Sequence, residues 1–199
     1  MAKFEDYVYE GTIILKNKFG ITNFNELKVL EEKIVLEKLI ALGIHPLNGN
    51  FDTNHIKAIH RFLFGDIYDF AGKYRDVEMF KEYTSYGDYH DIEKMLPIVL
   101  EKYNNMNIPE SSLFEKALFL ANFYKDIIYI HPFRDGNSRT TREFLREFVL
   151  EKMKDYELDY SRMDKETFKL ALKDPDNYSI NTLAYEFYKA LVKVNSKVK

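Results

Sequence analysis

The sequence predicts an all-α protein with one small β element. Along most of its 199 residues, apolar side chains recur at steps of three and four, the spacing of helices that bury one face. One segment, residues 73–89, instead alternates apolar and charged residues. No internal repeat, low-complexity tract or flexible linker divides the chain. We therefore expect a single domain over residues 1–199, with its core at about 52–175 and helical extensions at 1–50 and 176–199.

The first predicted helix spans residues 22–42. Thr22-Asn23 supply polar caps for the unpaired N–H groups of its first turn. We expect the helix to stop at Gly43, because glycine favours a helix end and Pro46 follows closely.

A second helix is predicted after the cap pair Asp52-Thr53. Its apolar residues, from Ile56 to Phe70, step by three and four. This spacing predicts one buried stripe on a helix that ends at Gly72.

The alternating segment is predicted to be a short hairpin or extended flap. In it Val77 and Met79 alternate with Asp76 and Glu78, and Thr, Ser and Gly residues then offer turn chemistry.

Helical spacing returns in three later segments, residues 92–103, 114–128 and 180–194. Ser111-Ser112 precede the second of these as caps. The last segment is predicted to be a single amphipathic helix at the tail.

Composition excludes several classes of function. The chain has no cysteine, so disulfides, thiolate nucleophiles and iron–sulfur clusters are ruled out. Its formal net charge of −3 argues against a protein that coats nucleic acid or anionic lipid. No apolar run reaches the ~18 residues of a membrane span, and no signal-peptide core is visible. We therefore expect a cytoplasmic protein with no membrane partner.

A polar loop between two predicted helices concentrates the chemistry. The first of these helices must end near His131, because Pro132 disfavours the helical conformation of the residue before it. The next helix is predicted to begin at Asn137 or Ser138, after a flexible glycine. The unpaired N–H groups and the positive dipole at that helix start would attract an anion.

Charged residues around this loop match that anion site. Arg139 and Arg142 lie three residues apart, hence on one helix face, and can clamp phosphates. His131 can accept a proton near neutral pH, and Asp135 can hold a divalent metal. Each residue alone is more often structural, as a packed histidine, a surface turn or a solvated helix face. Their combination within twelve residues favours a function.

The stretch His131-Pro-Phe-Arg-Asp-Gly-Asn-Ser-Arg-Thr-Thr-Arg142 resembles the signature of Fic-domain proteins, His-x-Phe-x-(Asp/Glu)-Gly-Asn-Gly-Arg-x-x-Arg. The resemblance extends upstream through residues 59–75 and into the N-terminal segments 7–11 and 15–18, which are similar to those of stand-alone bacterial Fic toxins. It implies the Fic fold, a helical bundle with a small β-hairpin flap over the active site.

This resemblance implies a protein adenylyltransferase, which moves AMP from ATP to a Tyr, Ser or Thr hydroxyl of a target protein and releases pyrophosphate. It assigns His131 as the base for the hydroxyl and Asp135 as the ligand of Mg²⁺ between the α- and β-phosphates. It assigns the phosphate-binding helix start to Gly136, Asn137 and Ser138, with the Asn137 side chain near the α-phosphate. It assigns the β-phosphate to Arg139 and the γ-phosphate to Arg142.

The resemblance also assigns a role to the flap. Residues 73–86 would bind an extended stretch of the target by β-strand addition, through Val77, Met79 and Phe80. Lys81 would lie beside the nucleotide.

Two residues depart from the family pattern, which has glycine at both positions. They are Glu82, which follows Lys81, and Ser138. If Ser138 must adopt positive φ, the substitution would cost roughly 1 kcal/mol.

Regulation is predicted to come from a second chain. Many Fic enzymes are blocked by a helix that carries (Ser/Thr)-x-x-x-Glu-(Gly/Asn). Here Ser111 with Glu115, and Thr182 with Glu186, match the first part of this pattern but lack its last residue. We therefore expect the toxin of a toxin–antitoxin pair, with a small antitoxin bound near Arg142. The resemblance points to a type II topoisomerase subunit as the target.

Three alternatives remain open. The first is a helical nucleic-acid-binding module with Arg139, Arg142 and Arg146 on the backbone, which the net charge disfavours. The second is a Fic-fold kinase that turns the nucleotide round. The third is a catalytically silent Fic-fold binding protein, which Glu82 and Ser138 keep open.

Overall fold

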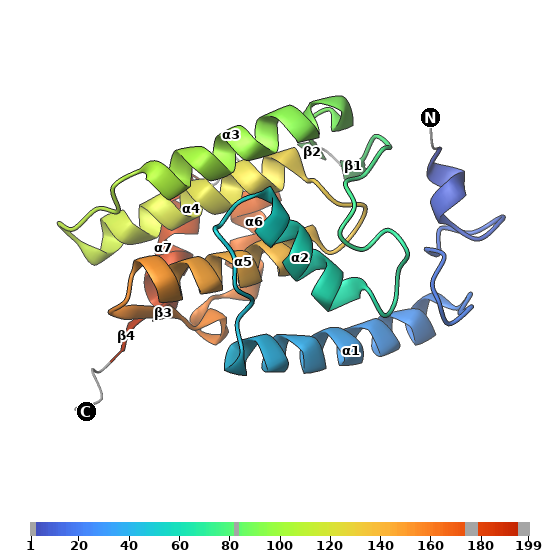
Figure 1. Ribbon diagram of the computed structural model, residues 1–199, viewed down its shortest axis with the longest axis horizontal. Helices are drawn as coiled ribbons and strands as arrows, with labels where there is room; N and C mark the ends of the chain where they lie inside the picture. Colours follow the sequence, from blue (N-terminus) through green and yellow to red (C-terminus); the bar gives the residue numbers. More distant parts are fainter. Residues whose placement is uncertain (1–2, 82–83, 174–178, 195–199) are drawn as a thin grey trace.

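The computed structural model describes residues 3–81, 84–173 and 179–194, and this part of the chain is mainly helical, as predicted (Figure 1). Its α-helices are α1 (Phe24–Ile44), α2 (Thr53–Phe64), α3 (Ile92–Asn105), α4 (Leu113–Ile130), α5 (Asn137–Lys152), α6 (Lys165–Lys173) and α7 (Ile180–Ala190). Short 3-10 helices are η1 (Phe4–Tyr7), η2 (Tyr89–Asp91) and η3 (Tyr160–Arg162). The strands are β1 (Phe80–Lys81), β2 (Thr84–Ser85), β3 (Tyr156–Leu158) and β4 (Leu191–Lys193).

Helices α4 and α5 form the centre of the bundle. Helix α4 packs along α7 and also contacts α3 and α5, while α2 lies against α5. In Figure 1, α3 and α4 run side by side at the top, and the long α1 lies along the bottom next to α2. The loop between α4 and α5 therefore lies at the centre of the fold, where Phe133 is fully buried.

Aromatic rings fill the space between α4 and α5. Phe123 of α4 meets Phe144 and Phe148 of α5 edge to face, with ring centroids 5.9 and 5.4 Å apart. All three side chains are almost fully buried. Such rings contribute a large apolar area to the core and, through their geometry, fix how the two helices pack.

Several predicted helix boundaries are confirmed. The side chains of Asn23, Asp52 and Ser112 accept hydrogen bonds from backbone N–H groups of the first turns of α1, α2 and α4. Helix α4 ends at Ile130, directly before His131, and α5 begins at Asn137.

The predicted end of the first helix is wrong by two residues. Gly43 lies inside α1, and the helix ends with His45 as its C-cap, in a non-helical conformation at φ −132° and ψ 86°. Pro46 explains this end better than Gly43, because proline excludes the residue before it from the helical region.

The predicted end of the second helix is also wrong. Helix α2 ends at Phe64 rather than at Gly72, and the chain continues in hydrogen-bonded turns, such as that from the N–H of Tyr68 to the carbonyl of Phe64 at 2.9 Å. Ile67 remains buried in these turns. Turns can therefore keep the apolar spacing of a helix without its regular geometry.

The tail is only partly helical. Leu191 does not extend α7 but begins β4, which pairs antiparallel with β3 so that Leu191 lies opposite Leu158. This second two-stranded sheet and helix α6 were not predicted.

The flap is a hairpin, as predicted. Strands β1 and β2 pair antiparallel, with Phe80 opposite Ser85 and Lys81 opposite Thr84. Glu82 and the side chains of Phe80 and Lys81 lie outside the described residues, so their expected roles stay predictions. In the described part of the chain, no helix combines the length and apolar character that crossing a bilayer demands.

Candidate active site

His131 stands where α4 ends, and the backbone turns sharply there. The residue has the left-handed conformation, with φ 51° and ψ 61°, which is uncommon for any residue but glycine. Its Nδ1 lies 3.3 Å from the carbonyl oxygen of Ile128. The ring of Tyr86, at the end of the flap, stacks on the imidazole with centroids 3.7 Å apart. The imidazole is therefore held between the last turn of α4 and the flap.

Gly136 directly precedes α5, and the local geometry requires glycine there. Its φ is 76°, and a Cβ atom at this position would lie 2.4 Å from Cε2 of Phe64. The backbone thus lies against α2, where only glycine fits without displacing the ring. This close approach fixes the start of α5.

The side chain of Asn137 bridges the loop that precedes α5. Its Oδ1 accepts the N–H of Phe133 at 2.8 Å, and its Nδ2 donates to the carbonyl of the same residue at 2.7 Å. The side chain is buried. Both of its polar groups therefore hold the loop closed, and its expected place near the α-phosphate stays a prediction.

Ser138 fits its position without strain. It lies in the first turn of α5, and the left-handed non-glycine residues that the structure describes are Phe51 and His131 alone. Its hydroxyl hydrogen-bonds the hydroxyl of Tyr124 at 2.8 Å. The cost expected for a serine at positive φ does not arise.

The two motif arginines lie on α5 as predicted. Nη1 of Arg139 is 2.6 Å from Oε1 of Glu31, a residue of α1. The guanidinium of Arg142 lies 5.8 Å from the ring centroid of Tyr160, with Nε 3.4 Å from the carbonyl of Ser138. Within the described ranges, Arg142 makes no ion pair with a carboxylate.

Asp135 offers a hard oxygen ligand beside these arginines. Its side chain is 45% exposed, Oδ1 accepts the N–H of Gly136 at 2.6 Å, and Nη2 of Arg139 lies 3.9 Å from the same oxygen. A single exposed carboxylate suits Mg²⁺, which keeps several waters and takes its other ligands from phosphates. The residues present therefore fit that ion.

His60 on α2 supports the loop between α4 and α5, a role that the sequence analysis did not assign to it. Its Nε2 lies 2.9 Å from the carbonyl of Asp135, and its Nδ1 accepts the N–H of Gly72 at 2.7 Å. The ring stacks on Phe133 with centroids 3.9 Å apart. Burial lowers the pKa of His60 to about 4, so the ring is neutral and Nε2–H donates to Asp135.

Arg75 is a second supporting residue that the sequence did not single out. Its buried guanidinium donates to the carbonyls of His131 and Val77, at 2.7 and 2.9 Å, and also to the carbonyl of Gly87. Desolvation lowers the pKa of Arg75. The cation therefore ties both ends of the flap to the loop that carries His131.

The flap residues expected to face a target differ in exposure. Val77 is buried, with 5% of its surface exposed, whereas Met79 is partly exposed. Val77 therefore anchors the flap to the domain, and of these two only Met79 offers a side chain to a partner.

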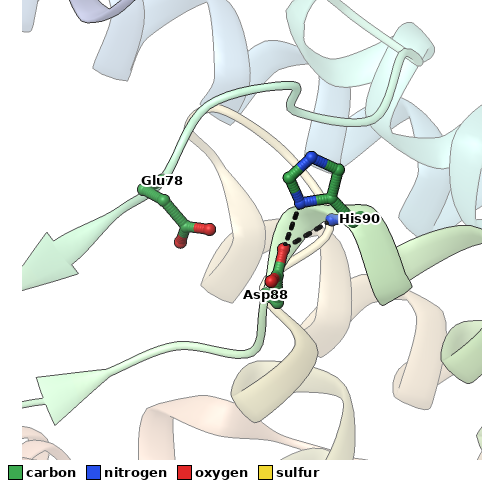
Figure 2. Close-up of side chains that lie close together, drawn as sticks. All are labelled: Glu78, Asp88 and His90. Atoms are coloured by element: carbon green, nitrogen blue, oxygen red, sulfur yellow. Dashed lines mark hydrogen bonds and ion pairs between the residues drawn. The ribbon is translucent and has the colours of Figure 1, made fainter.

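Three exposed side chains gather at the base of the flap (Figure 2). Glu78 lies before β1, while Asp88 and His90 follow β2, and their ligand atoms lie within 4.8 Å of one another. Oδ1 of Asp88 accepts hydrogen bonds from the backbone N–H of His90 at 2.9 Å and from its Nδ1 at 2.7 Å. These contacts, which lower the pKa of Asp88, cap the start of η2.

The two partial inhibitory patterns serve local structure. Ser111 bonds Glu115 at the exposed start of α4. Glu186 is buried on α7, where its Oε2 lies 2.6 Å from Nζ of Lys189 and 2.7 Å from the backbone N of Asp164. Neither glutamate is engaged with Arg142.

The structure thus brings a histidine at the end of α4, a glycine-preceded helix start and two arginines of α5 together in one helical domain. The sequence model of the Fic/DOC family matches residues 50–149. The chain belongs to the Fic/DOC family, which confirms the predicted family and the Fic fold.

Relatives and solved structures agree with this membership. The chain is 30% identical over 174 residues to the protein adenylyltransferase VbhT of Bartonella schoenbuchensis, covering 83% of this chain and about a third (35%) of VbhT. It is 27% identical to the probable protein adenylyltransferase Fic of Salmonella typhimurium, covering 94% and 92% of the two chains. The fold matches the N-terminal Fic domain of a putative cell filamentation protein from Bartonella quintana with bound ADP, at 25% identity and a TM-score of 0.81, over 96% of both chains. The predicted class of enzyme, a protein adenylyltransferase, is thus confirmed at the level of the family.

Proposed function

We propose that this chain transfers AMP from ATP to a hydroxyl side chain of a target protein. The observation that carries this proposal is the position of His131, held between Ile128 and Tyr86 directly before the helix start that bears Arg139 and Arg142. The names of its adenylyltransferase relatives and the ADP bound in a similar Fic domain also support this proposal.

In this mechanism His131 acts as the general base. In the tautomer whose Nδ1–H donates to the carbonyl of Ile128, the basic lone pair of the ring lies on Nε2. Nε2 takes the proton as the target hydroxyl oxygen bonds to the α-phosphorus. The bond from that phosphorus to the α–β bridging oxygen breaks, and pyrophosphate leaves with its electrons. The product carries AMP in a phosphodiester.

The rest of the site binds and orients the triphosphate. The N–H groups at the start of α5 face the phosphates, and Arg139 and Arg142 hold the β- and γ-phosphates. Asp135 would hold Mg²⁺, which neutralises charge on the phosphates when it is bound. Positioning and charge stabilisation of this kind account for most catalysis of phosphate transfer.

The partners follow from the flap and from Arg142. An extended stretch of the target adds to the flap beside Met79 and Phe80, and Lys81 approaches the nucleotide. We infer that this protein is the toxin of a toxin–antitoxin pair. It would act in the cytoplasm, and its target would be a type II topoisomerase subunit. The carboxylate of a small antitoxin would pair with Arg142, whose described contacts are a carbonyl and an aromatic ring.

The test uses ATP labelled at either the α- or the γ-phosphate. The purified chain is incubated with Mg²⁺, labelled ATP and purified topoisomerase subunits or a bacterial lysate. We expect α-label on a protein band, and we expect His131→Ala to abolish it. His45→Ala, at an exposed histidine after α1 and outside the site, serves as the matched control and should keep full transfer.

Other labelling patterns would reject the proposal. Label from the γ-phosphate alone would identify a kinase. The absence of both labels, with intact ATP binding, would identify a silent member of the family.

A further inference from the structure

Glu31 of α1 reaches the first arginine of the motif, which lies 108 residues further along the chain. Its Oε1 is 2.6 Å from Nη1 of Arg139, and its Oε2 accepts a hydrogen bond from the hydroxyl of Tyr68. The side chain of Glu31 is only 12% exposed. The carboxylate is thus fixed on one side by Tyr68 and ion-paired on the other.

The ion pair occupies only one edge of the Arg139 guanidinium. While Nη1 faces Glu31, Nη2 lies 3.9 Å from Oδ1 of Asp135. The guanidinium carbon lies 4.7 Å from the ring centroid of Phe64, which supports the group from one face. Since guanidinium carries five N–H donors in a rigid fork, the edge near Asp135 keeps donors for a phosphate.

We propose that Glu31 is a positioning residue, which holds Arg139 ready for the β-phosphate of the bound nucleotide. This inference rests on the proposed function. A free arginine loses considerable side-chain entropy when it binds a phosphate, and an arginine that is already ordered avoids most of that loss. Glu31 lies outside the residues that the family model matches, so α1 contributes to the site through this contact.

The test measures nucleotide affinity by titration calorimetry, with ATP, ADP and AMP on the full chain. We expect Glu31→Ala to weaken the binding of ATP and ADP about tenfold, because the order of Arg139 is lost. Affinity for AMP should stay unchanged, since AMP has no β-phosphate. A general loss of structure would weaken all three nucleotides alike, so the difference between ADP and AMP isolates the positioning role.

Four further variants sharpen this test. Glu31→Gln keeps an oxygen that can accept from Nη1 and should retain part of the affinity. Arg139→Ala should lose as much affinity for ADP as Glu31→Ala does or more, and the double variant should lose no more than Arg139→Ala alone. Glu32→Ala is the matched control, because Glu32 is exposed on the same helix and pairs only weakly with Lys28 at 4.0 Å.

Two results would overturn the inference. Equal affinities of the wild type and Glu31→Ala for ADP would show that Arg139 needs no support. Tighter binding of ATP by Glu31→Ala would show that Glu31 competes with the phosphate. If Glu31→Ala does not fold, Glu31→Gln decides, since unaltered ADP affinity beside a strong loss in Arg139→Ala would count against the ion pair.

This outcome is separate from that of the proposed function. A chain that binds ADP in a Glu31-dependent way but never transfers α-label would sink the proposed transfer and leave the positioning role intact. Full transfer of α-label by the wild type, together with unchanged ADP affinity in Glu31→Ala, would overturn the positioning role and leave the proposed transfer intact.

Discussion

The side chain of Arg75 donates a hydrogen bond from Nε to the carbonyl oxygen of His131 at 2.7 Å. The backbone N–H of the same arginine donates to the carbonyl of Pro132 at 2.8 Å. Because its other guanidinium nitrogens bond Val77 and Gly87 on either side of the flap, one buried cation fixes the flap and the base relative to each other.

Replacing Arg75 should therefore cost stability and activity together. Arg75→Met leaves several buried carbonyls without donors, so we expect the free energy of unfolding to fall by about 3 kcal/mol. Urea unfolding measures this loss. Arg162→Met, at an exposed arginine of η3, should change stability by less than about 0.5 kcal/mol. A similarly small change in Arg75→Met would mean that the flap is not held by this residue.

Gly136→Ala should damage the start of α5. The added Cβ must tolerate φ 76° and would also lie 2.4 Å from Phe64. Gly11 has a similar φ of 70° but open space around it, so Gly11→Ala isolates the backbone cost of about 1 kcal/mol. We expect Gly136→Ala to lose roughly 2 kcal/mol more than this control and to bind ATP at least tenfold more weakly. If Gly136→Ala and Gly11→Ala lose the same free energy of unfolding, measured by heat or urea, the close approach of Gly136 to Phe64 does not contribute to the cost.

The sequence predicts those parts of the molecule that depend on local interactions. The caps Asn23, Asp52 and Ser112 bond within their own first turns, and the start of α5 follows from Gly136 and its neighbours. Because these helix ends are set locally, the sequence correctly placed His131 at the end of α4 and the two motif arginines on α5.

Long-range contacts explain what the sequence missed. Strand β4 exists because Leu191 pairs with Leu158, a partner that no local pattern reveals. The supporting roles of Glu31, His60 and Arg75 depend on contacts between elements far apart in the chain. The burial of His60 on the inner face of α2 was the one signal that could have indicated its role, because a buried histidine needs hydrogen-bond partners.

The stability of the protein should fall between pH 6.5 and pH 4 because of His60. Its pKa is lowered to about 4 in the folded chain, whereas unfolded histidine titrates near 6.5. In that window the unfolded state binds a proton that the folded state does not, so stability is complete above pH 6.5 and declines as the pH falls. The difference corresponds to about 3 kcal/mol for the whole window.

Urea unfolding at a series of pH values measures this contribution. His60→Gln should remove that part of the pH dependence, although its stability at pH 7 will be lower because the contacts to Asp135 and Gly72 change. His45→Gln, at an exposed histidine, should keep the wild-type slope. An identical slope in His60→Gln and the wild type would show that other groups cause the decline.

Tyr86 should matter for the transfer step through its ring rather than its hydroxyl. The ring stacks on His131 at 3.7 Å, and an aromatic pair of this kind contributes about 1 kcal/mol to the order of the two rings. We expect Tyr86→Ala to lower kcat for AMP transfer by about tenfold, as the imidazole loses its fixed orientation. Tyr86→Phe keeps the stack and should stay within about threefold of the wild type. Because Arg139 and Arg142 are untouched, ATP affinity should be the same in both variants. Weaker ATP binding by Tyr86→Ala, with kcat preserved at saturation, would instead place this ring at the nucleotide and not at the base.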